Sequence, residues 1–265
     1  MPTTTGLGAT DYDAFAPYYD AFTTGSDYDA WTEHVLRQAR RDGLAGATLL
    51  DLACGTGKSF VPFLRRGFQV TACDVSEGML AQAAAKAPEA TLVHADIRRM
   101  ARLGSFDLVT CFDDSLNYLL EEGDLAGALC AIADNLSPRG LAVFDLNTLL
   151  AYRTTFARDS VSIADGLVFA WSGACSGDAE PGCHAAARID IFVAREAGMY
   201  ERVTTLHAQR HFPRERVTAL LGEAGLECVG VHGVLDDGAL EAEADELRHL
   251  KFLYVARLAK GGDYQ

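Results

Sequence analysis

The feature that most constrains the fold is a short apolar run that leads directly into a glycine turn. Residues 49–52 are followed by Ala53-Cys54-Gly55-Thr56-Gly57, and we expect a helix from Lys58 onward. A strand, a glycine turn and a helix in this order are typical of an α/β unit whose backbone a ligand approaches closely. A phosphate-binding P-loop would require glycine at position 52, where Leu52 stands, so that motif is not predicted.

Further apolar runs recur along the chain, with helical segments between them. The runs cover 48–52, 69–73, 91–94, 106–111 and 141–144. Helices are predicted over 29–41, over 77–87 and over 124–136, where leucine and isoleucine recur at intervals of three and four. This alternation predicts a doubly wound, mostly parallel sheet.

The pattern changes after the fifth strand. Segments 161–171, 188–195 and 200–211 have the character of strands, and turns with glycine or proline separate them. We therefore expect a small antiparallel insertion over 151–211, between a core over 1–150 and a completing part over 212–265. In that last part a helix over 213–224 and strands over 226–235 and 252–258 are predicted, with the acidic run 236–246 as a solvated loop or helix.

Charge and cysteine content exclude several kinds of protein. The formal net charge is −14, and no basic stripe is present that could hold a nucleic acid. No apolar run is long enough to cross a bilayer and no signal peptide is visible, so we expect a cytoplasmic protein without a membrane partner.

The seven cysteines are odd in number and form no C-x-x-C pair, which favours reduced thiols. A metal site from Cys175, Cys183 and His184 is not favoured, because the spacing is uneven, and no metal is expected.

Asp74 ends the second apolar run, 19 residues after Gly55. A carboxylate at this distance from a glycine turn can accept hydrogen bonds from both hydroxyls of a ribose. The alternative is an acidic cap on the following helix. Ligand binding is favoured, because a cap does not need that spacing.

Five motifs together resemble the class I S-adenosylmethionine-dependent methyltransferases that act on small molecules. In chain order they are LLDLACGTG, VTACDVSEGML, HADI, FDLVTCFDDSLNYLL and LSPRGLAVFDLNT. The resemblance covers about residues 45–150, and Tyr18-Tyr19-Asp20 and HFPRERVTALLGEAGL resemble the flanking parts of such enzymes. It implies a Rossmann-like fold with a seven-stranded sheet, S-adenosylmethionine as cofactor, an N-terminal helical lid and an inserted β lid that recognises the acceptor.

The resemblance also assigns cofactor contacts. It places the methionine end of the cofactor at the glycine turn, the ribose at Asp74, the adenine between Met79 and the Asp96-Ile97 pair, and the sulfonium beside Phe112, with Tyr19 closing the site. The residues expected to bind the cofactor are therefore Tyr19, Asp51, Ala53, Gly55, Gly57, Asp74, Met79, Asp96, Ile97 and Phe112.

Candidates for catalysis and for acceptor binding follow the fourth strand and end the insertion. Asp113 and Asp114 can contact an acceptor or take its proton, although one of them would serve as a helix cap. His207 and His211 are candidates for a base or a substrate contact, with a structural role as the alternative. The residues expected to bind the substrate are Asn117, Tyr118, Trp171 and Arg210, with packing of the small sheet as the alternative for Trp171.

We expect methyl transfer to an oxygen or nitrogen of a small-molecule metabolite, in a setting such as antibiotic biosynthesis. One alternative is the same fold with Asp113 and Asp114 used for a cyclisation or an intramolecular displacement. Others are a non-catalytic partner subunit and an NAD-dependent dehydrogenase, which fits poorly because G-T-G-K-S-F lacks the later glycine that admits a pyrophosphate. A homodimer is compatible with the sequence.

Overall fold

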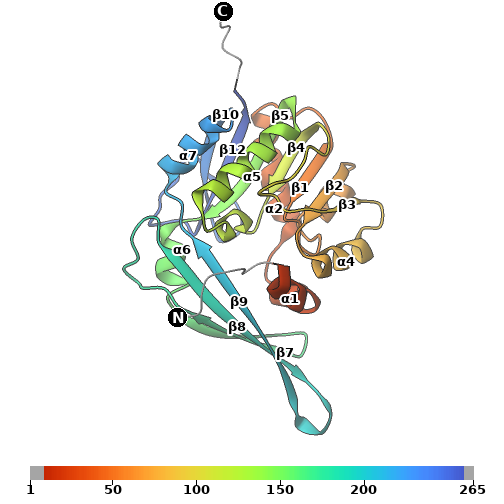
Figure 1. Cartoon of the computed structure of the whole chain (residues 1–265), viewed down its shortest axis with the longest axis vertical. Coiled ribbons are helices and arrows are strands. Elements are labelled where there is room, and N and C mark those ends of the chain that lie inside the picture. Colours follow the sequence, from red (N-terminus) through yellow and green to blue (C-terminus); the bar gives the residue numbers. More distant parts are fainter. Residues whose placement is uncertain (1–8, 260–265) are drawn as a thin grey trace, which may run out of the picture.

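The computed structural model describes residues 9–259 and contains two sheets (Figure 1). The larger sheet has eight strands in the order β11-β10-β12-β5-β4-β1-β2-β3. Neighbours among β1 to β5 pair in parallel, and β12 is antiparallel to both β5 and β10. The strands are β1 (Thr48–Leu52), β2 (Gln69–Asp74), β3 (Thr91–His94), β4 (Phe106–Cys111), β5 (Leu136–Asn147), β10 (Leu226–Val234), β11 (Leu240–Glu241) and β12 (Lys251–Leu258).

The mostly parallel sheet confirms the expected fold class, with one added strand. The resemblance implied a seven-stranded sheet, and the eighth strand is β11, which has two residues and lies within the acidic run 236–246. It pairs antiparallel with Gly233 and Val234 of β10. The run 236–246 therefore contributes an edge strand as well as turns.

Helices cover both faces of the larger sheet. They are α1 (Ala9–Phe22), α2 (Tyr28–Arg41), α3 (Val61–Arg65), α4 (Glu77–Lys86), α5 (Glu122–Asn135), α6 (Leu149–Thr154) and α7 (Arg214–Glu223), with the short 3-10 helices η1 (Ser115–Tyr118) and η2 (Glu196–Gly198). The helix expected from Lys58 begins only at Val61, because turns continue through residue 60. Side chains cap two helices: Asp27 accepts from the N–H of Ala30, and Ser76 accepts from the N–H of Met79.

Successive residues of the central strands supply two separate cores. Leu50 and Phe144 pack with α5 and α7 on one face. Leu49 and Val143 pack with α2, α3 and α4 on the other. This division follows from the period of two in a strand, and it explains why the buried strands are apolar almost throughout.

The smaller sheet is an antiparallel insertion between β5 and α7. Its strands are β6 (Asp159–Ala164), β7 (Leu167–Gly173), β8 (His184–Ala194) and β9 (Tyr200–Arg210), in that order. They form a long twisted extension from the main body (Figure 1). One face packs on α1, where Phe15 and Phe22 contact Phe169 and Ile191. The insertion and α1 together cover the carboxyl-end side of the parallel strands.

No helix within residues 9–259 is long and apolar enough to span a bilayer. The same residues hold no group of three or more His, Cys, Asp or Glu side chains placed to bind a metal ion.

Candidate active site

A first cavity of about 400 Å³ lies at the carboxyl ends of β1, β2 and β4. Parallel α/β sheets bind their ligands in this location. Eight of the residues expected to bind a cofactor line it: Tyr19, Ala53, Gly55, Asp74, Met79, Asp96, Ile97 and Phe112. Asp51 and Gly57 are not part of its lining.

The two glycines of the turn have different surroundings. Both have positive φ, 52° at Gly55 and 86° at Gly57. A Cβ added at Gly55 would approach only Tyr19, at 4.0 Å, so the backbone there is open toward the cavity. A Cβ at Gly57 would lie 2.9 Å from the ring of Phe60. Gly55 therefore leaves room for a ligand, whereas Gly57 leaves room for Phe60.

Asp51 lies beneath the turn and bonds to protein on both oxygens. Ser59 donates to Oδ2 over 2.6 Å, and Thr110 donates to Oδ1 over 2.5 Å. The carboxyl is 1% exposed, and this burial raises its pKa to about 7. Asp51 holds the turn against β4 from inside the protein.

Asp74 is fixed at the end of β2 by backbone donors. The N–H of Gly55 donates to Oδ2 and the N–H of Ser76 donates to Oδ1, each over 2.8 Å. Burial raises the pKa of this carboxyl, and the backbone hydrogen bonds oppose that rise. The carboxylate therefore links the glycine turn to the start of α4 at the cavity wall.

Asp96 forms an ion pair that the motif alone did not indicate. Nη2 of Arg98 lies 2.6 Å from Oδ2, and the N–H of Arg98 donates to Oδ1 over 3.0 Å. The hydrogen bond from the Arg98 side chain is the main reason that the pKa of Asp96 is lowered. Both residues line the first cavity.

Helix α1 covers the first cavity and is held there by its acidic side chains. Asp20 accepts from the hydroxyl of Thr56 over 2.6 Å and lies 2.5 Å from Nζ of Lys86. Asp13 accepts from the hydroxyl of Ser76 over 2.5 Å and from the N–H of Gly78 over 2.9 Å. The helix therefore bonds to the loops that form the cavity, and it carries Tyr19 to the cavity wall.

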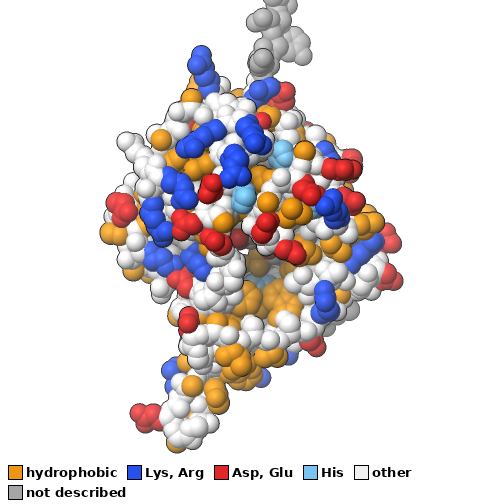
Figure 2. All heavy atoms as spheres, turned by 180° about the vertical axis from the view of Figure 1, so that it is seen from behind, with side chains coloured by type: hydrophobic (Ala, Val, Ile, Leu, Met, Phe, Trp, Pro, Cys, Tyr) orange, Lys and Arg blue, Asp and Glu red, His pale blue; other side chains and the backbone are white. Residues whose placement is uncertain are grey.

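A second cavity of about 410 Å³ lies between the carboxyl ends of the strands, α1 and the smaller sheet. It shares five lining residues with the first cavity: Tyr12, Tyr19, Tyr28, Asp113 and Tyr118. Figure 2 shows a hollow with hydrophobic side chains around it at the junction of the main body and the smaller sheet. The two cavities are therefore neighbours that share one wall.

The backbone at Asp113 and Asp114 is left-handed, with φ of 58° and 50°. Such a conformation is uncommon for residues with a side chain and must be held by its surroundings. The buried carboxyl of Asp145 provides this, because it accepts from the N–H of Asp113 over 3.2 Å and from that of Asp114 over 2.6 Å. Burial raises the pKa of Asp145 to about 6, and the nearby ammonium of Lys251 opposes that rise.

The carboxylates of Asp113 and Asp114 have different partners. Nζ of Lys251 lies 2.7 Å from Oδ1 of Asp114, and Gln209 donates to its Oδ2 over 2.5 Å. Tyr28 donates to Oδ2 of Asp113 over 2.7 Å. Asp114 is thus bonded on both oxygens, whereas Asp113 lies at the shared wall with its bond from Tyr28.

His207 lies in the wall of the second cavity, and its ring is buried. Nδ1 lies 3.1 Å from the hydroxyl of Tyr118, and Nε2 lies 2.9 Å from that of Thr205. Burial lowers the pKa of His207 to about 4. The imidazole is therefore neutral near pH 7, and it positions Tyr118 more readily than it holds a proton.

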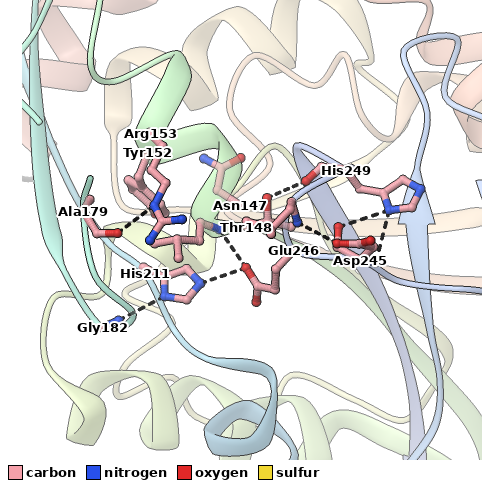
Figure 3. Close-up of polar contacts among 12 residues, drawn as sticks. Asn147, Thr148, Tyr152, Arg153, Ala179, Gly182, His211, Asp245, Glu246 and His249 are labelled. Carbon is pink, nitrogen blue, oxygen red and sulfur yellow. Dashed lines mark hydrogen bonds and ion pairs between the residues drawn. The ribbon is translucent and has the colours of Figure 1, made fainter. Parts of the chain in front are cut away.

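His211 is not among the lining residues of either cavity, and Figure 3 shows its ring between Gly182 and Glu246. Its Nδ1 accepts from the N–H of Gly182 over 3.0 Å, which places the ring proton on Nε2, 3.3 Å from Glu246. Glu246 also accepts from the N–H of Leu149 over 2.8 Å. These contacts join the insertion to α6 and to the segment before β12. The position of His211 fits the structural alternative.

The four expected substrate residues have separate locations. Tyr118 and Trp171 line the second cavity, and Trp171 donates from Nε1 to the carbonyl of Thr155 over 3.1 Å. Asn117 is buried and donates to the carbonyl of Arg210, while it accepts from the N–H of Asn147. Arg210 donates to the carbonyl of Leu120 and covers the ring of Phe212, outside the lining of both cavities.

Sequence reasoning missed several polar residues of the shared wall. Asp145 is an acid inside the apolar run of β5, and such a residue is a usable signal for a buried polar contact. Tyr28 and Lys251 lie in segments whose local sequence does not indicate a role at the shared wall. Gln209 of β9, which bonds to Asp114, was not among the expected site residues.

Comparisons with known proteins agree with these features. The model of a family described as a methyltransferase domain matches residues 49–140. A protein of Geobacillus sp. (strain WCH70), named as a methyltransferase, is 32% identical over 234 residues, which cover 86% of this chain and 94% of that protein. The dTDP-3-amino-3,4,6-trideoxy-alpha-D-glucopyranose N,N-dimethyltransferase of Streptomyces venezuelae is 33% identical over 133 residues, 49% of this chain and 56% of that enzyme.

A solved structure shows the same fold over almost the whole chain. It is an S-adenosylmethionine-dependent methyltransferase from Clostridium acetobutylicum, with a TM-score of 0.79 and 24% identity, and the match covers 94% of this chain and 99% of that one. The motif resemblance, the chain-length relative and the shared fold agree, and they confirm the family and the cofactor expected from the sequence. The chain belongs to the class I S-adenosylmethionine-dependent methyltransferases.

Proposed function

We propose that this enzyme binds S-adenosylmethionine in the first cavity and a small-molecule acceptor in the second cavity, with methyl transfer across the shared wall. The observation that carries this proposal is the contact between two cavities of similar volume at Tyr19, Tyr28 and Asp113. When bound, the cofactor supplies a methyl group activated by a sulfonium. Holding donor and acceptor in adjoining cavities provides the proximity on which such a displacement depends.

The residues of the first cavity fit the cofactor in size and chemistry. The open backbone of Gly55 leaves space for the methionine portion, because a Cβ at this position would have only Tyr19 within 4 Å. Asp74, fixed by two backbone donors, is suited to accept from ribose hydroxyls. Met79 and Ile97 offer buried apolar surface for the adenine. Asp51 would act through the turn that it supports.

The insertion over residues 151–211 serves in this proposal as a recognition lid for the acceptor. Phe169, Trp171 and Ile189 line the second cavity and are absent from the lining of the first. Helix α1 would close the first cavity, because Asp13 and Asp20 already bond to its loops. A small metabolite as acceptor is supported by the Streptomyces relative, whose name describes methylation of an amino sugar.

Calorimetry with S-adenosylmethionine, S-adenosylhomocysteine and NAD tests the cofactor assignment. The first two ligands should bind with dissociation constants on the order of micromolar, and NAD should not bind. Asp74→Asn should weaken S-adenosylhomocysteine at least about tenfold, because an amide replaces the acceptor of charged hydrogen bonds. The matched control is Asp134→Asn on the exposed side of α5, which should bind as the parent does. Equal affinity in the two variants would remove Asp74 from the cofactor site.

A further inference from the structure

We propose that the methyl acceptor is an amine carried on an apolar or aromatic molecule that has no phosphate group. This inference rests on the proposed function, since it identifies the second cavity as the acceptor site. Three observations on that cavity carry it: the composition of its walls, its balance of charge, and the bases available to the acceptor atom.

The outer wall of the second cavity is aromatic. Phe22 and Phe169 meet edge to face with ring centroids 5.4 Å apart, and Phe156 and Trp171 meet at 5.2 Å. These four side chains and Ile189 all line the cavity. Figure 2 shows hydrophobic side chains around the hollow at this place. Such a wall binds an apolar or ring-shaped group, and the hydroxyls of Thr155, Ser160 and Ser162, which line the same cavity, can contact a few polar substituents on it.

The inner wall is acidic. Among the described lining residues, Asp113 and Asp114 are the carboxylates and Lys251 is the single Lys or Arg. The ammonium of Lys251 lies 2.7 Å from Asp114 and 3.5 Å from Asp145, so two carboxylates already neutralise it. Asp113 accepts a hydrogen bond from Tyr28 and forms no ion pair within the part of the chain that the structure describes, so its charge can attract a cation at the wall where the two cavities meet.

Among the described residues, Lys251 is the only lysine or arginine that lines this cavity, and Asp114 and Asp145 already pair with it. Phosphates are bound by arginine, lysine or the free N–H groups of a helix N-terminus. Helix α6 begins beside the cavity, but the N–H of Leu149 already donates to Glu246 over 2.8 Å. Arg210 is outside the lining, where it donates to the carbonyl of Leu120. A nucleoside diphosphate would therefore face the carboxylate of Asp113, with no unpaired lysine or arginine among the described lining residues.

The acceptor atom is best matched by nitrogen. His207 is a poor base for an alcohol, because burial lowers its pKa to about 4 and its two ring nitrogens already lie 3.1 and 2.9 Å from the hydroxyls of Tyr118 and Thr205. A phenolate would bring a second negative charge beside Asp113. An ammonium releases one proton to solvent, and the lone pair of the neutral amine then forms the N–C bond. The C–S bond breaks at the same time, and sulfur keeps the electron pair of the C–S bond. The product is again a cation, which Asp113 stabilises.

The test uses four probes on protein saturated with S-adenosylhomocysteine: 2-phenylethylamine, 2-phenylethanol, 3-phenylpropionate and dTDP-glucose. We expect calorimetry to rank the amine first, with the alcohol at least tenfold weaker and the two anions weaker still. Asp113→Asn should weaken the amine at least tenfold and leave the alcohol within threefold. Asp159→Asn, an exposed acid on the edge strand β6, is the matched control and should leave all four unchanged.

The outcomes separate this inference from the proposed function. Failure of S-adenosylhomocysteine to bind would reject the proposed function itself. If that ligand binds, the inference is overturned when dTDP-glucose or the carboxylate binds more tightly than the amine, when the amine does not bind, or when Asp113→Asn leaves amine affinity unchanged. A circular dichroism spectrum matching that of the parent shows that the variant has folded.

Discussion

The phenol of Tyr28 donates a hydrogen bond of 2.7 Å to the carboxylate of Asp113 at the wall shared by the two cavities. This contact joins the start of α2 to the loop after β4. It fixes the orientation of the carboxylate that lies nearest to both ligands in the proposed arrangement. Its removal should therefore affect the reaction more than the fold.

Tyr28→Phe is expected to lower kcat about tenfold, because loss of one charge-assisted hydrogen bond corresponds to about 1–2 kcal/mol. The affinity for S-adenosylmethionine should stay within about threefold, under 1 kcal/mol. Steady-state kinetics with an accepted amine and calorimetry with the cofactor measure the two effects. Tyr200→Phe, at an exposed site on β9, is the control. An unchanged kcat would show that Tyr28 does not position Asp113.

Gly55→Ala and Gly57→Ala should separate ligand binding from stability. Both substitutions place a side chain at positive φ, which costs about 1–2 kcal/mol. At Gly57 the added carbon also meets Phe60 at 2.9 Å, so this variant should lose more stability than the other. At Gly55 the added carbon enters the first cavity, so cofactor affinity should fall most there. Urea unfolding and calorimetry on both variants provide the check, and the reverse order of effects would contradict the geometry.

Asp51→Asn should change how stability depends on pH. The pKa of Asp51 is raised in the folded state, to about 7 from its ordinary value of 3.8, so the folded protein holds this proton more tightly than the unfolded chain. Its contribution to stability is full below pH 4 and is lost as the pH rises toward 7. The asparagine variant lacks that loss, so its free energy of unfolding relative to the parent should rise between pH 4 and 7, by up to about 4 kcal/mol.

Urea titrations of the apo protein at pH 5 and pH 8 measure this change. Asp134→Asn, whose carboxyl is exposed, should show no such difference between the two pH values. If Asp51→Asn lost as much relative stability at pH 8 as at pH 5, the raised pKa would be wrong.

His207→Gln and His211→Ala should have different effects. His207 lines the second cavity, so its substitution should raise the KM of the acceptor with cofactor affinity unchanged. Because its pKa is lowered to about 4, the pH profile of kcat between 5 and 8 should not change in shape. His211 bridges Gly182 and Glu246 and lines neither cavity, so its loss should cost about 2–3 kcal/mol of stability and leave the KM within threefold. A catalytic role for His211 would instead appear as a large fall in kcat in a stable variant.

Lys251→Met should destabilise the protein more at high pH than at low pH. Burial disfavours the charged form of Lys251, but the carboxylates of Asp114 and Asp145 more than offset this, so its pKa is raised. Without the ammonium, the two carboxylates repel each other, at a cost of about 2–4 kcal/mol at pH 8. The pKa of Asp145, already about 6, should rise further, so protonation below pH 6 should recover part of the loss. Unfolding curves at pH 5.5 and pH 8 would contradict this if the destabilisation were equal at both.

The order of the core elements could be predicted because its causes are local. Apolar runs such as 106–111 and 69–73 indicate strands that are buried on both faces. In a helix, apolar residues three and four positions apart indicate the buried face. That the glycine turn and Asp74 lie close together could also be predicted, because the carboxyl ends of neighbouring parallel strands meet at one edge of the sheet. The contact between Gly55 and Asp74 is an instance.

Tertiary packing determined which polar side chains contact one another at the shared wall. It also determined which of them support the fold and which face a cavity. Asp145 and Lys251 are far apart in sequence, and only the pairing of β5 with β12 brings them to the Asp113-Asp114 turn. His207 and His211 lie four residues apart, yet one lines the second cavity and the other bridges α6 and the segment before β12, because β9 ends between them. A local sequence pattern indicates which side of an element is buried. It does not indicate which distant side chain packs against that side. The identity of this distant side chain determines whether a carboxylate or an imidazole supports the fold or faces a ligand.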